Sequence, residues 1–263
     1  MTFLEQVRPL YLISGFIIGA LTGITGTGGG ALMTPVLILL FGVHPVTAVG
    51  TDLIYASITK ASGTVVHGLN KTIDWPVVGW LALGSIPTTA LTILMLYELD
   101  IHGNATQAIV TRVLGVALFL TAISLVFRKQ IMDFYARKAG FVSPVLVRNL
   151  TILIGAVLGI LVSISSVGAG AIGVTALILL YPEMPTVRIV GSGIAHSVPL
   201  TLIAGAGHWM LGSIDWALLV SLLVGSVPGI ILGSIISARV PEPVVRFTLC
   251  ATLIVICAKF WFF

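Results

Sequence analysis

The chain is built from long apolar segments with almost no charges, and this pattern determines the solvent in which it can fold. Only 8% of its 263 residues are Asp, Glu, Lys or Arg, whereas 57% are hydrophobic. A soluble domain carries about 25% charged residues, so this chain could not cover a water-facing surface. Because about 20 consecutive apolar residues span a bilayer as a helix, the sequence predicts an all-α polytopic integral membrane protein.

The first half of the sequence recurs in the second. "GFIIGALTGITGTGGGALMTPVLILL" from Gly15 resembles "GAVLGILVSISSVGAGAIGVTALILL" from Gly155, at a separation of 140 positions that becomes 141 further on. The matched pairs include Gly15/Gly155, Gly19/Gly159, Gly28/Gly168, Gly30/Gly170, Gly50/Gly191, His67/His208, Asp74/Asp215 and Pro87/Pro228. This register predicts two homologous transmembrane repeats, 9–128 and 148–263, joined by a linker, 129–147.

The linker region is the longest polar stretch of the chain, and its charge indicates the orientation in the membrane. Basic residues outnumber the single acidic residue, Asp133, by five to one. The basic residues are Arg128, Lys129, Arg137, Lys138 and Arg148. Since basic loops stay on the cytoplasmic side, we expect a cytoplasmic linker.

Each repeat has room for about four spans, but its first segment has two interpretations. The segments 9–42 and 149–180 are too long for one simple helix and are interrupted by glycines. A single broken span would give four crossings and parallel repeats. A hairpin of a full and a partial helix would give five-plus-five inverted repeats, a common plan among transporters.

The glycine-rich interruption of each half suits an anion. Consecutive glycines do not hold a regular helix, and unwound backbone at membrane depth is tolerated only inside the protein or at a water-filled cavity. The short helix that follows then points its positive end at that position. The candidate binding residues are Thr25, Gly26, Thr27, Gly28, Gly29 and Gly30 in the first half and Ser165, Ser166, Gly168, Ala169 and Gly170 in the second.

Few ionisable residues fall within the predicted spans, and such residues usually mark a pathway or a partner. Asp52 and Lys60 have the uncharged counterparts Gly193 and Thr201, which indicates a role special to the first half. That role is proton coupling or an internal ion pair, and we assign proton coupling to Asp52, Lys60 and His196. His67 and His208 recur as a pair, which favours a substrate contact, although an interfacial histidine bonded to a loop carbonyl fits equally well.

The chain resembles the sulfite exporter TauE/SafE family, also called the toluene-sulfonate uptake permease family. The likeness rests on the "GxxxGxxxGxTGxGGG…TP" opening, the "VGTD" of residues 49–52, the His67 region and the weaker second copy. The resemblance implies a bacterial-type inner-membrane carrier of sulfur-containing anions such as sulfite or organosulfonates. Carried across by motif, the implied site comprises Gly26 to Gly30, Thr51, Asp52, Ser166 to Gly170 and Ser192.

These observations predict a secondary transporter of a small sulfur anion that works by alternating access between two repeats. A cation carrier or channel, or a carrier of other organic anions, is the alternative. An intramembrane enzyme or an assembly factor is disfavoured because no H-E-x-x-H motif or Ser/His/Asp set has suitable spacing. We expect no cofactor, no metal site and no nucleic-acid partner. The oligomeric state stays open, a homodimer included.

The glycine-rich hinge of the first half gives a direct test. We expect Gly28→Leu to abolish transport while the protein still reaches the membrane, because a side chain would enter the position where the anion approaches the backbone. Uptake into vesicles and the amount of protein in the membrane fraction would be measured together. Normal uptake by this variant would exclude an anion site at the first hinge.

Overall fold

The computed structural model describes residues 9–25, 30–99, 103–127 and 143–237, together with residues 130, 251, 256 and 259. Within these ranges the chain is all-α, with nine helices and no strand. The helices are α1 (Pro9–Thr25), α2 (Gly30–Leu39), α3 (Pro45–Leu69), α4 (Trp75–Glu98), α5 (Asn104–Val126), α7 (Pro144–Ser165), α8 (Ala171–Leu180), α9 (Thr186–Met210) and α10 (Trp216–Ser237). The expected all-α architecture is confirmed. Most of the linker, the first glycine-rich hinge and most of the last predicted span lie outside the described residues.

The described helices are long and apolar enough for a multi-pass membrane protein. Five of them, α4, α5, α7, α9 and α10, have the length and hydropathy of membrane spans. Their outward-facing side chains are apolar, as shown by the exposure of Leu83, Leu91, Val157 and Ile231. A water-facing helix would carry polar residues at these positions. α3 has the same 25-residue length as α9 but carries Asp52 and Lys60.

The first segment of each half is a hairpin of a long and a short helix. In the first half, the Tyr11 ring near the start of α1 lies 4.7 Å from the Phe41 ring just after α2. In the second half, Thr151 near the start of α7 and Tyr181 after α8 share a 2.8 Å hydrogen bond between their hydroxyls. Both short helices therefore run back along the long ones. Of the two interpretations of these segments, the hairpin is the one the structure adopts.

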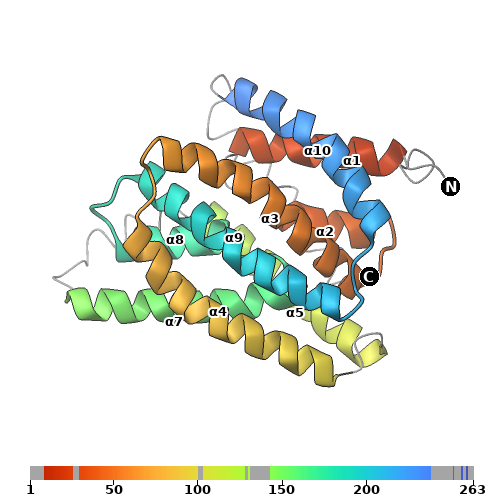
Figure 1. Ribbon diagram of the computed structural model, residues 1–263, viewed down its shortest axis with the longest axis horizontal. Helices are drawn as coiled ribbons and strands as arrows, with labels where there is room; N and C mark the ends of the chain where they lie inside the picture. Colours follow the sequence, from red (N-terminus) through yellow and green to blue (C-terminus); the bar gives the residue numbers. More distant parts are fainter. Residues whose placement is uncertain are drawn as a thin grey trace.

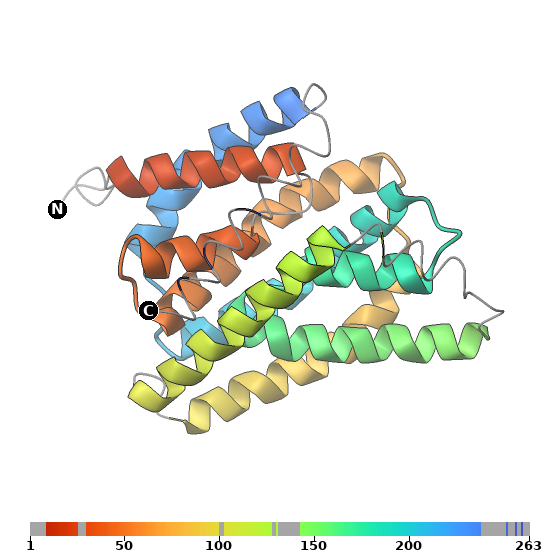
Figure 2. The same cartoon turned by 180° about the vertical axis from the view of Figure 1, so that it is seen from behind.

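The helices form three groups side by side, with α3 and α9 in the centre (Figures 1 and 2). α3 and α9 run antiparallel, since Gly50 at the start of α3 lies against His208 at the end of α9, and Gly191 lies against His67. α1 packs beside α10 on one flank, and α4 packs beside α7 on the other. We call the contact between α3 and α9 the central seam.

Both flanking pairs bring two backbones into close contact at glycines. A Cβ atom on Gly19 of α1 would lie 2.5 Å from the Ser226 carbonyl oxygen of α10. A Cβ atom on Gly159 of α7 would lie 2.6 Å from the Ser85 carbonyl oxygen of α4. The two contacts correspond under the 140- and 141-residue shifts seen in the sequence. Each flank thus pairs a helix from one sequence half with a helix from the other, so the halves interlock.

α4 offers a matched pair of glycines that tests this packing. Gly84 has no room for a side chain, because a Cβ atom there would clash with the Ile152 carbonyl of α7, whereas Gly79 has open space around it. We expect Gly84→Leu to destabilise the protein by about 1–3 kcal/mol or more, since overpacking displaces a backbone. Gly79→Leu is the control and should melt like the wild type in a detergent thermal-unfolding assay. Equal melting temperatures for all three proteins would contradict the close α4–α7 contact.

Candidate functional site

The described hinge, between α7 and α8, breaks a helix inside the protein. Ser166 adopts a left-handed conformation with φ of 60°, and Gly168 has φ of 118°. Ser166 is almost fully buried, and its backbone N–H caps α7 by donating to Val162 at 2.7 Å. Left-handed backbone is uncommon for a residue other than glycine, and when buried it often marks a functional position. The break between α7 and α8 is therefore part of the buried core.

Asp52 of α3 lies beside this hinge. Its side chain is fully buried, and Thr34 of α2 donates a 2.5 Å hydrogen bond to Oδ2. The Ser166 hydroxyl lies close to the same carboxyl group, yet neither Asp52 Oδ1 nor Ser166 Oγ has a hydrogen-bond partner among the described residues. A carboxyl group of the first half thus meets the hinge of the second.

Lys60 and His196 continue this polar region along the central seam. Lys60 is buried and interacts electrostatically with both Asp52 and His196. The Nε2 atom of His196 lies 2.8 Å from the Ser85 hydroxyl. At the corresponding position of α3, Tyr55 approaches Ser226. We call these residues the central polar cluster: Thr34, Asp52, Tyr55, Lys60, Ser85, Ser166, His196 and Ser226.

The central polar cluster contains most of the unpaired polar atoms of the described core. Four buried side-chain atoms of described residues have no hydrogen-bond partner, and three of them belong to Asp52, Tyr55 and Ser166. An unpaired buried polar atom costs roughly 1–3 kcal/mol, so a protein seldom collects several in one place without a use. Several unpaired polar atoms in one buried region are typical of a ligand-binding site.

The cluster also lies near the middle of the helices that form it. Lys60 and His196 are each within about one turn of the midpoints of α3 and α9. The antiparallel contacts Gly50–His208 and Gly191–His67 place those midpoints side by side. Transporters bind their substrates near the bilayer midplane, at the contact between repeats and beside interrupted helices. The central polar cluster lies likewise at the middle of its helices, on the contact between the two halves and next to an interrupted helix.

His67 and His208 lie at opposite ends of the seam, away from its middle. His67 Nδ1 lies 2.8 Å from the Thr72 hydroxyl, and His208 Nδ1 lies 3.0 Å from the Ser213 hydroxyl. The buried His208 ring also donates from Nε2 to the Ser163 carbonyl at 2.9 Å. Both rings are therefore engaged in holding the turns that follow their helices. The interfacial interpretation fits these contacts better than a substrate contact does.

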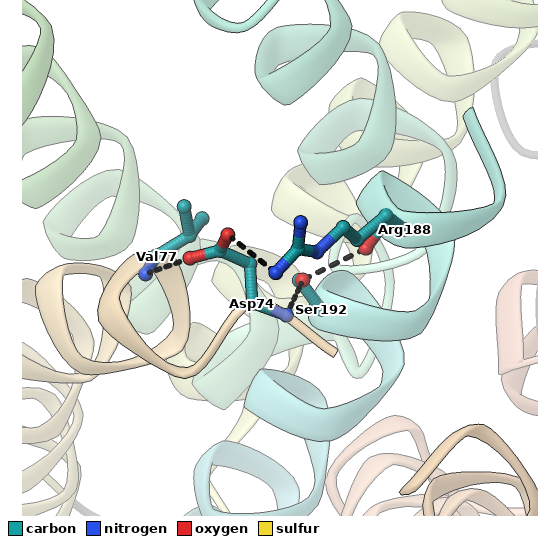
Figure 3. Close-up of polar contacts among 4 residues, drawn as sticks. All are labelled: Asp74, Val77, Arg188 and Ser192. Atoms are coloured by element: carbon teal, nitrogen blue, oxygen red, sulfur yellow. Dashed lines mark hydrogen bonds and ion pairs between the residues drawn. The ribbon is translucent and has the colours of Figure 1, made fainter. Parts of the chain in front are cut away.

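Thr51 and Ser192 anchor the two turns that cross the seam. The Ser192 hydroxyl accepts from the Asp74 backbone N–H at 2.8 Å, and Asp74 also pairs with Arg188 at 3.5 Å (Figure 3). At the other end, the Thr51 hydroxyl accepts from the Asp215 backbone N–H at 3.1 Å. These hydroxyls bind protein backbone in the same way at both ends. Their geometry assigns them to the scaffold of the seam.

The structure thus brings together some of the predicted site residues and separates others. Asp52 and Ser166 lie together at the hinge, whereas Lys60 lies about two turns further along α3 and interacts with His196 of α9. Ser165, Ala169 and Gly170 belong to the same hinge, where the Ser165 hydroxyl donates to Leu161 at 2.7 Å. Gly26 to Gly29 lie outside the described residues, and of Thr25 and Gly30 only the place in α1 and α2 is described.

Four members of the cluster were not predicted as site residues: Thr34, Tyr55, Ser85 and Ser226. Ser85 and Ser226 belong to the repeated "GSIP" and "GSVP" sequences, so their recurrence was a usable signal. Thr34 stands before Pro35 in the glycine-rich motif. Tyr55 carried no signal, because its counterpart in the second half is His196 and the pair differs in residue type.

Comparison with known proteins gives a consistent result. The profile of the family described as Sulfite exporter TauE/SafE matches residues 11–260. The probable membrane transporter protein YjnA of Bacillus subtilis is 40% identical over 246 residues, which cover 93% of this chain and 96% of the relative. The probable membrane transporter proteins YdhB of Bacillus subtilis and MJ0441 of Methanocaldococcus jannaschii are 26% and 27% identical, covering 92% and 75% of this chain and 96% and 70% of the relatives. No solved structure shows significant similarity to the chain.

The paired histidines give a testable distinction between scaffold and site. We expect His208→Ala to lower the free energy of unfolding by about 1–3 kcal/mol, because it leaves the buried Ser163 carbonyl without its donor. Anion affinity should stay at the wild-type value. Thermal unfolding and calorimetric titration of the same preparation measure both quantities, with the half-buried His67→Ala as a milder comparison. A large loss of affinity without a loss of stability would place His208 in the binding site instead.

Proposed function

This chain is a member of the sulfite exporter TauE/SafE family, and we propose that it is a secondary transporter of small sulfur-containing anions, either sulfite or an organosulfonate. The family profile spans nearly the whole chain, and its relatives are named as probable membrane transporters. These names are consistent with a protein that moves a solute and carries out no reaction on it. The choice of a sulfur anion rests on the family description and on the chemistry of the central polar cluster.

The observation that carries the proposal is a buried cation in the middle of the central seam. Lys60 supplies the positive charge, and the hinge lies about two helical turns away along α3, where the Ser166 hydroxyl approaches Asp52. The N-terminus of α8 lies at that hinge, and Gly170 is its N-cap residue. Helix N-termini and ammonium groups both favour anions. A tetrahedral oxyanion accepts several hydrogen bonds at once, so convergent donors of this kind suit sulfite or a sulfonate.

We further propose that alternating access moves two helix bundles that differ from the two sequence halves. Among the described helices, one bundle contains α1, α2, α3 and α10, and the other contains α4, α5, α7, α8 and α9. The close glycine contacts hold α10 to α1 and α4 to α7, so each bundle includes a helix from the opposite half. The bundles meet at the central seam, where a rocking motion would expose the polar cluster to one side and then to the other.

The proposed orientation puts the linker in the cytoplasm, with the two halves as inverted repeats. Lys71, Arg148 and Arg188 all lie at the end of the bundle where the linker is attached, in the α3–α4 turn and at the starts of α7 and α9. The turns at the opposite end that the structure describes contain no lysine or arginine. This distribution follows the positive-inside rule and supports a bacterial-type inner membrane location.

Transport in a purified system tests the proposal. We expect proteoliposomes containing the protein to take up labelled sulfite down its gradient, and excess ethanesulfonate to compete with it. Protein-free liposomes and sodium or divalent-cation tracers are the controls. Movement of a cation with no sulfite uptake would overturn the assignment and favour the cation carrier, in which Asp52 would bind the ion. Chemical conversion of sulfite by the detergent-solubilised protein would instead indicate an enzyme.

A further inference from the structure

We propose that Lys60 binds the negative charge of the transported anion. The anion replaces Asp52 as the counter-ion of Lys60, and Asp52 takes up one proton as the anion enters. This inference rests on the proposed function and deepens it, because it names the residue that holds the substrate and the ion that moves with it. It follows from the position, the partners and the asymmetry of these two side chains.

Lys60 has the position of a ligand-binding cation. It lies in the middle of α3 on the central seam, with only 8% of its surface exposed. Within the described part of the chain, its amino group makes no hydrogen bond and no ion pair, although it interacts electrostatically with Asp52 and His196. A buried charge without close partners is costly, and in a membrane protein it marks a functional site. An anion at this position would supply the missing partner.

Asp52 has the position of a replaceable counter-ion. Its Oδ2 atom accepts from Thr34 at 2.5 Å, whereas Oδ1 is unpaired among the described residues. With Asp52 ionised and Lys60 protonated, the empty site is electrically neutral. A bound monoanion would leave one uncompensated negative charge inside the protein. A proton on Asp52 Oδ1 restores neutrality, and the new O–H can donate to Ser166 or to an oxygen of the anion.

The surroundings of Asp52 offer few other places for that proton. Tyr55 and Lys60 of α3 are the described titratable groups that interact with it, whereas His196 of α9 interacts with Lys60 and contacts Ser85. His208 of α9 lies by the start of α3 but has both ring nitrogens occupied. The other elements packed around α3 contribute hydroxyls or apolar side chains. These are Thr34 of α2, Ser166 of the hinge, Val110 of α5, Leu158 and Val162 of α7 and Ser226 of α10.

The second half carries no equivalent charge pair, so the chain holds one such site. The counterparts of Asp52 and Thr34 are Gly193 and Val174, and a Cβ atom on Gly193 would lie 3.2 Å from Val174. The polar pair of the first half is therefore replaced by an apolar contact in the same place. The counterpart of Lys60 is Thr201, whose hydroxyl donates to Ser197 within α9. We expect one anion and one proton for each chain.

Calorimetric titration of the full-length protein in detergent with ethanesulfonate tests this inference. Ethanesulfonate keeps a single negative charge between about pH 5 and pH 8, so any pH dependence in this range comes from the protein. Titrations in two buffers with different heats of ionisation count the protons taken up. For the wild type we expect one site, uptake of one proton per anion, and affinity that rises about tenfold for each pH unit of acidification while Asp52 is ionised in the empty protein.

Three variants separate the roles of the two side chains. Asp52→Asn should bind ethanesulfonate about tenfold more tightly at neutral pH and without proton uptake, because Lys60 no longer has a competing carboxylate. Adding Lys60→Met to Asp52→Asn should reduce affinity by about a hundredfold or more, without leaving an unpaired buried carboxylate to unfold the protein. Lys71→Met makes the same chemical change on an exposed turn and should bind like the wild type.

The outcomes distinguish this inference from the proposed function. If wild-type protein binds and transports sulfite but Asp52→Asn keeps the same proton uptake, Asp52 is not the proton acceptor. If Asp52→Asn/Lys60→Met binds ethanesulfonate as tightly as Asp52→Asn alone, Lys60 is not the anion ligand. Either result overturns the inference and leaves the transporter in place. Failure of the wild type to bind or transport either anion would overturn the proposed function itself.

Discussion

Close backbone contact at glycines is the constraint on which the rest of this structure depends. Lipid surrounds the helices, so burial of apolar side chains gives little drive to associate them, and van der Waals packing at small residues must do so. Gly15, Gly19 and Gly225 bring α1 against α10, and Gly84, Gly155 and Gly159 bring α4 against α7. Since each pair joins the two sequence halves, these contacts bind the halves into interlocked bundles and leave the central seam as the boundary between them.

The central seam combines close glycine contacts at its ends, Gly50 against Ser213 and Gly191 against Thr72, with a polar middle. Its two ends are held by hydrogen bonds from turns to side chains, such as Asp74 to Ser192 and Asp215 to Thr51. Its middle contains the central polar cluster with several unpaired atoms. A seam with secured ends and an unsatisfied middle suits the proposed binding site, because a ligand at the middle would supply the missing contacts.

Much of this arrangement was predictable from sequence, for reasons that lie in particular residues. The apolar segments predicted an all-α membrane protein, and the glycines at Ser166–Gly170 predicted a break that the structure contains. The hairpin was left open because sequence spacing does not determine whether a chain reverses at a break. The recurrence of His67 and His208 left a substrate contact and an interfacial role equally open, because a repeated scaffold conserves its own hydrogen bonds in the same way as a repeated site. The pairing of α4 with α7 and of α10 with α1 depends on three-dimensional contacts between the halves, which the spacing of residues in the sequence does not reveal.

The asymmetry of the two halves has an electrostatic reason. The antiparallel contacts Gly50–His208 and Gly191–His67 put Lys60 and its counterpart Thr201 within about one turn of the same level on neighbouring helices. Two ammonium groups so close in a poorly solvated interior would repel each other by roughly several kcal/mol. At this level of the central seam, a lysine is therefore favourable on only one of the two helices, α3 or α9. Lys60 and Asp52 both lie on α3, and the second half fills the space equivalent to Asp52 and Thr34 with Gly193 against Val174.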